Sequence, residues 1–64
     1  MYKAIIIDDE ENCLNILEWE LKNSCPEIEV VALCATGKEG LKVIKDNQID
    51  LVFLNIEMPY INDI

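Results

Sequence analysis

The sequence predicts an α/β domain in which three parallel strands alternate with two helices. Short apolar runs rich in β-branched residues alternate with stretches of helical periodicity, and only short connections separate them. The last run, Leu51 to Leu54, is continuously apolar, which is typical of a strand that is covered on both faces, as in a parallel sheet. The order β-α-β-α-β then implies two right-handed crossovers.

The first strand is expected at residues 4–7, where Ala-Ile-Ile-Ile stops abruptly at Asp8-Asp9-Glu10. A helix is expected from residue 11 to about residue 23, because leucines recur there with helical spacing on one stripe, at Leu14, Leu17 and Leu21. The acidic residues at its start suit the positive end of the helix dipole. Pro26 ends this helix, because proline cannot continue a helix interior.

The second strand is expected at residues 29–35, and a capping box follows it. Thr36 can accept a hydrogen bond from the backbone N–H of Glu39, while the Glu39 carboxylate reaches back. In the helix that starts there, we expect Leu41 and Ile44 to be buried and the lysines to face solvent. The third strand is expected at residues 49–54, with a loop from Asn55 onward.

The composition excludes several classes of function. The chain has 64 residues, 13 acidic against 5 basic side chains, and a formal net charge of −8. This balance argues against nucleic-acid binding by this segment, because phosphate contacts need clustered basic residues. With no histidine, a His-based metal site or general base is impossible. No apolar run is long enough to span a membrane, whereas the 52% apolar content argues against a disordered tail.

The size and the cysteines place further bounds on the chain. For so short a chain, apolar burial and the entropy of ordering nearly cancel, so a partner surface or further chain is expected to add stability. The three cysteines are odd in number, lack C-x-x-C spacing and accompany no export signal. We therefore expect reduced thiols that act as small apolar residues in a cytoplasmic protein.

Polar residues follow both the first and the third apolar run. Asp8-Asp9-Glu10 alone fits a simple structural interpretation, in which an Asp caps the first helix and the rest is a solvated turn. The functional interpretation is a site for a hard cation, since Mg²⁺ takes oxygen ligands, usually one or two carboxylates and waters. The cluster at residues 55–59, at the matching end of the third strand, favours the functional interpretation, because ligands of open α/β sheets bind beyond the carboxyl ends of strands.

These motifs together resemble a known family. The sequences IIIDDE at residues 5–10, TGKE at 36–39 and DLVFLNIEMP at 50–59 are similar to the response regulator receiver domain, the phosphoryl-accepting module of two-component phosphorelay signal transduction. The resemblance implies that residues 1–64 are its N-terminal half, with a partial flavodoxin-like (CheY-like) fold and strand order 2-1-3. The wording ENCLNIL and IEMP is similar to receivers that precede a LytTR-type DNA-binding domain.

The resemblance also assigns roles to individual residues. Asp9 directly, and Asp8 through water, match the acidic pair that holds Mg²⁺, and the backbone carbonyl of Glu57 matches a further ligand. Position 55 matches the phosphoryl acceptor, which is an Asp in the family but is Asn55 here. A carboxamide is uncharged and a poor nucleophile, so the chain as written has no catalytic residue, is no enzyme and cannot be phosphorylated at this position. Loss of one negative charge should also weaken Mg²⁺ binding.

Two explanations of Asn55 remain open. One is an engineered Asp→Asn exchange that keeps the shape of the side chain while blocking phosphorylation. The other is a naturally degenerate receiver that works through contacts alone. The otherwise intact motif around position 55 favours the first. An Asn that only caps loop backbone groups fits either explanation.

Partners follow from the same resemblance. The intact family protein would work with a histidine kinase and an output domain, and any DNA binding would belong to that output domain. The absent half would carry the fourth and fifth strands, which leaves the third strand as an open edge that could pair with a second copy by dimerisation or domain swapping. The alternative function is therefore a structural or assembly fragment without metal or phosphoryl chemistry. A Mg²⁺-dependent phosphatase fits less well, because Asp8-Asp9 lacks D-x-D spacing.

Overall fold

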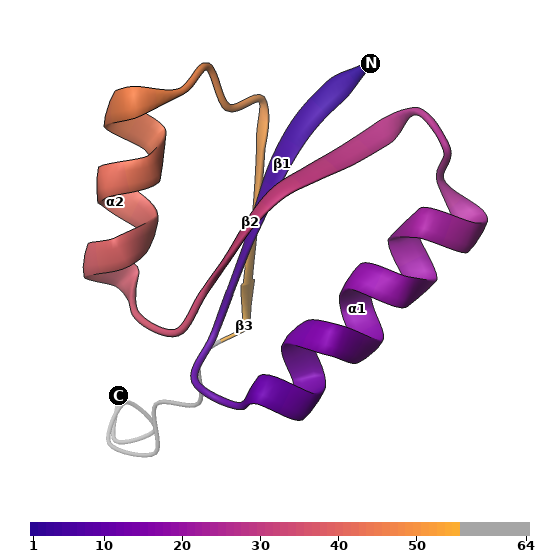
Figure 1. Cartoon of the computed structure of the whole chain (residues 1–64), viewed down its shortest axis with the longest axis horizontal. Helices are drawn as coiled ribbons and strands as arrows, with labels where there is room; N and C mark the ends of the chain where they lie inside the picture. The colour runs from indigo at the N-terminus through magenta and orange to yellow at the C-terminus, as the bar shows by residue number, and fades with distance from the viewer. Residues whose placement is uncertain (56–64) are drawn as a thin grey trace, which may run out of the picture.

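The computed structural model describes residues 1–55, with only the backbone of Asn55, and it has the predicted β-α-β-α-β order. Three parallel strands form one sheet in the order β2-β1-β3 (Figure 1). The predicted fold class and strand order are thus confirmed. The elements are β1 (Tyr2–Asp8), α1 (Glu11–Ser24), β2 (Ile28–Cys34), α2 (Gly37–Asp46) and β3 (Leu51–Asn55).

The central strand β1 carries the core, and the two helices lie on opposite faces of the sheet, as Figure 1 shows. Residues 4–7 are all buried, so side chains of one short strand serve both faces. Ile5 and Ile7 pack with Cys34 on the α2 face. Ile6 packs on the α1 face with the leucine stripe that the helical spacing predicts: Leu14 and Leu21 are buried, and Leu17 is partly buried against them.

The β2 strand contains an irregularity that the sequence analysis did not anticipate. Ala4 pairs with Val30 and Ile5 with Ala32, so Val31 has no partner on β1. An extra residue of this kind turns the following part of a strand over. Val30 accordingly packs in the α1 cluster, whereas Ala32, two residues later, packs in the α2 cluster. The extra residue lets one apolar strand contribute to both layers of the core.

The predicted cap of α2 by Thr36 is confirmed, and Glu39 reaches back as expected, but to the N–H of Ala35, one residue before the N-cap. The Glu39 backbone N–H donates to Thr36 Oγ1 at 3.2 Å, and the Ala35 N–H donates to Glu39 Oε1 at 2.8 Å. One backbone donor of the first helical turn and one in the connection before it are thereby satisfied. Since Ala35 directly follows β2, the Glu39 carboxylate ties the end of β2 to the first turn of α2.

The prediction that α2 buries Leu41 and Ile44 is wrong. The two side chains are 64% and 37% exposed, and the buried position of the helix is Gly40. The helix comes close to β1 through Gly40, where a Cβ would meet the Ile7 side chain, and Val43 packs beside it. The close approach at a residue without a side chain rotates Leu41 away from the sheet. Lys38, Lys42 and Lys45 are exposed, as expected.

The expectation that β3 is covered on both faces is also wrong for the described residues. Leu51, Val52 and Leu54 are 38%, 46% and 64% exposed. The cause is its position in the sheet, because both helices pack against β1 and β2 while β3 is an edge strand. Phe53 is the exception, partly buried against the α1-face cluster.

Candidate functional site

The carboxyl ends of β1 and β3 lie side by side. The two strands pair in parallel from Ala4 with Leu51 through to Asp8 with Asn55. The last pair places the acidic turn of β1 next to position 55, where the sequence analysis expected the acceptor position. This strand-tip pair is the candidate site.

Asp8 is the buried member of the acidic turn. Its side chain is only 3% exposed, whereas Asp9 and Glu10 are exposed. Asp8 Oδ1 accepts a hydrogen bond of 2.9 Å from the Glu10 backbone N–H, and the Cys13 thiol also hydrogen-bonds to the Asp8 side chain. A buried carboxylate must be compensated in this way, because an isolated one is costly to desolvate. The turn thus holds one carboxylate in place and leaves the next free to face solvent.

The structural interpretation in which an Asp caps the first helix is wrong. The residue at the N-cap of α1 is Glu10, and no side chain caps this helix. The N–H groups of Cys13 and Leu14 instead donate to the Glu10 carbonyl, at 3.1 Å each. Neither aspartate side chain therefore caps α1, although Asp8 holds the turn that leads into the helix through its bond to the Glu10 N–H.

Cys13 is a member of the site that the sequence analysis missed. Partial burial, followed by the negative charges of Asp8 and Glu10, raises the pKa of the Cys13 thiol. The thiol therefore stays protonated and can donate to the Asp8 carboxylate. Its place in the sequence could have indicated this contact, because Cys13 lies in the first turn of α1, directly after the acidic turn. All three cysteines of the chain are free thiols in the structure.

The donor set suits a hard cation that keeps much of its water. Asp8 and Asp9 offer carboxylate oxygens at one strand tip, and Mg²⁺ is commonly held by one or two carboxylates with waters completing its octahedron. Residues 1–55 contain no group of three or more His, Cys, Asp or Glu side chains arranged to hold a metal. Two carboxylates from one turn are the number that Mg²⁺ commonly takes while it keeps several waters. The expected ligand Glu57 lies outside the described residues.

A hollow of about 360 Å³ opens beside the acidic turn, on the β2 side of β1. Four carboxylates line it, those of Asp8, Asp9, Glu11 and Glu39. Leu14 and Leu33 form part of its apolar lining. The carboxyl end of the described sheet is therefore negative on the β2 side of Asp8.

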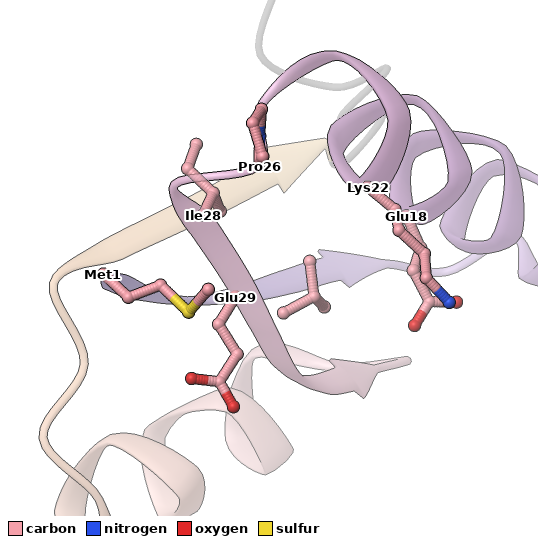
Figure 2. A pocket seen from close by; sticks show the side chains of 7 residues that line it. Met1, Glu18, Lys22, Pro26, Ile28 and Glu29 are labelled. Carbon is pink, nitrogen blue, oxygen red and sulfur yellow. The ribbon is translucent and has the colours of Figure 1, made fainter.

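A second hollow, of about 380 Å³, lies at the other end of the sheet. Figure 2 shows Glu18 and Lys22 reaching in from α1 on one side, with Met1 and Glu29 on the other. Pro26 and Ile28 border it at the start of β2. It faces the amino ends of β1 and β2, whereas ligands of open α/β sheets bind at the carboxyl ends. We therefore assign the site to the strand tips at Asp8 and Asn55.

Sequence comparison agrees with the fold. The profile of the response regulator receiver domain matches residues 4–63. The chain belongs to this family, the receiver domains of two-component response regulators. The resemblance of the sequence to receivers is confirmed, while the finer likeness to LytTR-type regulators is not resolved by these matches.

Curated relatives support the assignment. The chain is 42% identical over 62 residues to a response regulatory protein of Yersinia pestis, covering 97% of the chain and 26% of that protein. It is 41% identical over 59 residues to a protein-glutamate methylesterase/protein-glutamine glutaminase of Nitratidesulfovibrio vulgaris, covering 92% of the chain and 16% of that protein. The response regulator ArlR of Staphylococcus saprophyticus is 32% identical over 62 residues, covering 97% of the chain and 27% of ArlR.

The chain thus spans between 16% and 27% of the length of these relatives. No solved structure matches it significantly. Within residues 1–55, neither helix has the length and apolar character that crossing a membrane requires.

Proposed function

We propose that this chain is the N-terminal half of a receiver domain, with a Mg²⁺ pocket and a disabled phosphoryl acceptor at Asn55. The observation that carries the proposal is the pairing of Asp8 with Asn55 at adjacent strand tips. It brings the acidic turn to the position that accepts the phosphoryl group in the family.

The chemistry at position 55 decides what this pocket can do. An aspartate carboxylate attacks phosphorus as an anion while Mg²⁺ neutralises the oxygens of the transferred group. The carboxamide of Asn55 has no charge and cannot form the same acyl phosphate. The domain therefore binds the cation weakly and does not turn over a phosphoryl group, so it is not itself an enzyme. An engineered Asp→Asn exchange remains the favoured origin of Asn55, with a naturally degenerate receiver as the alternative.

In this proposal Asp9 binds Mg²⁺ directly, Asp8 binds through water, and the Glu57 carbonyl completes the protein ligands. The exposure of Asp9 and the burial of Asp8 fit this division, because an exposed carboxylate can enter the inner shell of a hydrated ion. Bound Mg²⁺ would supply positive charge between the strand tips. Asp8, held by Glu10 and Cys13, would orient the hydration shell.

Calorimetric Mg²⁺ titration tests this assignment. We expect millimolar binding to the unaltered chain and at least about tenfold weaker binding to Asp9→Ala, equivalent to about 1.4 kcal/mol. Glu29→Ala is the matched control, because it removes the same charge from an exposed residue at the amino end of β2. Equal heats for the unaltered chain and Asp9→Ala would refute the metal pocket.

The partners of the whole protein are part of the same proposal. A histidine kinase would dock on the intact receiver in the cytoplasm, and an output domain would follow it in the longer chain. A LytTR-type DNA-binding domain is our proposal for that output, from the ENCLNIL and IEMP wording. Several relatives are named protein-glutamate methylesterases, which is a property of those proteins. Nucleic-acid and membrane binding are not proposed for this acidic segment.

A second candidate function is assembly through β3. The specific observation is that β3 is an edge strand whose Leu51, Val52 and Leu54 are exposed. An open, apolar strand edge can pair with the same edge of another copy. Size exclusion with light scattering distinguishes the two candidates: a concentration-dependent dimer that Val52→Lys abolishes supports assembly. A folded monomer at micromolar concentration contradicts it.

A further inference from the structure

The register between β1 and β3 decides which residue faces the acidic turn. The pairing places Asn55 opposite Asp8. Because side chains alternate between the faces of a strand, a slip of one residue would exchange every side chain of β3 between the two faces. It would also bring a sequence neighbour of Asn55, Leu54 or Ile56, opposite Asp8. The candidate site therefore depends on a single register.

Hydrophobic patterning does not select this register. Residues 51–54 of β3 are all apolar, so a one-residue slip replaces apolar side chains by apolar side chains on either face. Three of them, Leu51, Val52 and Leu54, are also substantially exposed, so the described core imposes little shape on them. A strand without a polar and an apolar face is only weakly specified in register. Another contact must choose between the alternatives.

Two reciprocal hydrogen bonds between Asp50 and Lys3 distinguish the observed register from its alternatives. The Asp50 backbone N–H donates to the Lys3 carbonyl at 2.8 Å, and the Lys3 backbone N–H donates to Asp50 Oδ2 at 2.9 Å. In a longer parallel ladder, a backbone carbonyl of the incoming strand would receive the Lys3 N–H. The Asp50 carboxylate takes the place of that carbonyl directly before β3 begins at Leu51.

We propose that Asp50 sets the register of β3 and is thereby a positioning residue for the strand-tip site at Asp8 and Asn55. Both hydrogen bonds are directional and join one residue of the incoming chain to one residue of β1. Two apolar contacts compete as sources of register: Ile49 is partly buried against the α2-face cluster and Phe53 against the α1-face cluster. Both contacts are non-directional, and a one-residue slip would put Val52 or Leu54, also apolar, in the place of Phe53, so they discriminate between pairings less sharply than the two hydrogen bonds.

Nuclear Overhauser effects across β1 and β3 test the proposal. The unaltered chain should pair Ile5 with Val52 and Ile7 with Leu54, as should Asp50→Asn, because its amide oxygen can still accept from the Lys3 N–H. Asp50→Ala should lose this single pairing and gain a second set of contacts, shifted by one residue. Asp46→Ala, which removes the same charge from the end of α2, and Ile49→Ala should keep the original pairing. An unchanged single pairing in Asp50→Ala would overturn the proposal.

Hydrogen exchange covers the case in which Asp50→Ala does not fold. In the unaltered chain, the Lys3 amide should exchange at least about tenfold more slowly than in the unfolded chain, because it is held by a charge-assisted hydrogen bond. Protection should persist in Asp50→Asn. A Lys3 amide that exchanges without protection in the unaltered chain would overturn the proposal independently of any variant.

The metal readout rests on the proposed function and is kept separate from the register readout. If Asp50 positions the site, Asp50→Ala should weaken Mg²⁺ binding about tenfold, whereas Asp50→Asn and Asp46→Ala should stay within about twofold of the unaltered chain. Absence of Mg²⁺ binding in the unaltered chain would refute the metal pocket and leave the register result intact. A shifted register with unchanged Mg²⁺ binding would refute the positioning role of Asp50.

Discussion

Gly40 of α2 lies directly against Ile7 of β1. A Cβ at position 40 would overlap Ile7 Cδ1 and lie 3.0 Å from Ile7 Cγ1. Ile7 is buried and β-branched, so it has little freedom to move aside. The missing side chain at Gly40 is therefore what lets α2 approach the strand whose end carries the candidate site.

Gly40→Ala should destabilise the fold. Replacing glycine within a helix gains about 1 kcal/mol of propensity, whereas overpacking a core costs about 1–3 kcal/mol. The clash involves a stiff, buried side chain, so we expect a net loss of about 1 kcal/mol in urea unfolding followed by circular dichroism. Gly37→Ala is the control: nothing lies within 4 Å of its Cβ position, so it should leave stability unchanged or raise it. Equal effects at both positions would contradict the close packing.

Glu39→Ala should destabilise the start of α2. The Glu39 carboxylate accepts from the Ala35 N–H at 2.8 Å, and loss of a capping contact costs about 1 kcal/mol. Glu39→Gln should stay close to the unaltered chain, because glutamine also serves as the reaching residue of a capping box. Thermal unfolding of the three proteins measures the difference. A glutamine variant as unstable as the alanine variant would show that charge, not capping, is the contribution of Glu39.

Stability should fall as the pH rises above the ordinary pKa of a cysteine. Burial, and then the negative charge of Glu39, raises the pKa of the Cys34 thiol in the folded chain. Its stabilising contribution is complete below the pKa of the unfolded chain and is lost as the pH rises through the higher pKa of the folded chain, since the unfolded chain releases the proton first. Urea unfolding at increasing alkaline pH measures this. The free energy of unfolding should fall less steeply with pH in Cys34→Ala than in the unaltered chain. An identical fall in that variant would assign the effect to other groups.

Asn55→Asp should lower the stability of the metal-free chain and raise its affinity for Mg²⁺. The added carboxylate lies next to Asp8 in the sheet register, so without metal its repulsion should lower stability. With millimolar Mg²⁺, binding should be about tenfold tighter than in the unaltered chain, because each added negative charge strengthens attraction of the cation. Calorimetry measures the change in Mg²⁺ affinity, and urea unfolding without Mg²⁺ measures the change in stability. Weaker binding in Asn55→Asp would place the metal away from position 55.

The sequence predicts most of the architecture because its local signals agree with one another. The cap of α2 by Thr36 and the leucine stripe of α1 both rest on short-range spacing, and both are confirmed. Strand boundaries are less well predicted: β2 begins one residue earlier and β3 two residues later than expected. The ends of a strand depend on pairing with its neighbours, which local spacing does not encode.

The errors arise where tertiary contacts override the local pattern. Leu41 and Ile44 have helical spacing, but periodicity alone does not determine which side of a helix faces the sheet. In the structure α2 packs against β1 through Gly40, so Leu41 and Ile44 lie on a more exposed side. The unpaired Val31 follows from the fit of β2 to both layers. Asp50 looks like an ordinary polar residue before a strand, and only the sheet reveals its pairing with Lys3.

The candidate site was predictable in outline. Asp8, Asp9 and position 55 were singled out by their places after two apolar runs, and the strand order brings the two tips together. The hydrogen bond from Cys13 to Asp8 was not predictable, because it depends on how α1 leaves the acidic turn. The metal-binding roles of Asp8, Asp9 and Glu57 remain predictions.

The most direct test of a cation site between the two strand tips is paramagnetic broadening by Mn²⁺, which accepts the same oxygen ligands as Mg²⁺. In a titration of the ¹⁵N-labelled chain, the amide signals of Asp9 and Asn55 should broaden first, and excess Mg²⁺ should restore them. Signals of Tyr2 and Ile28, at the amino ends of β1 and β2, should stay sharp throughout. Broadening that begins at Tyr2 and Ile28, or that spares Asn55 while affecting Asp9, would contradict a cation held between β1 and β3.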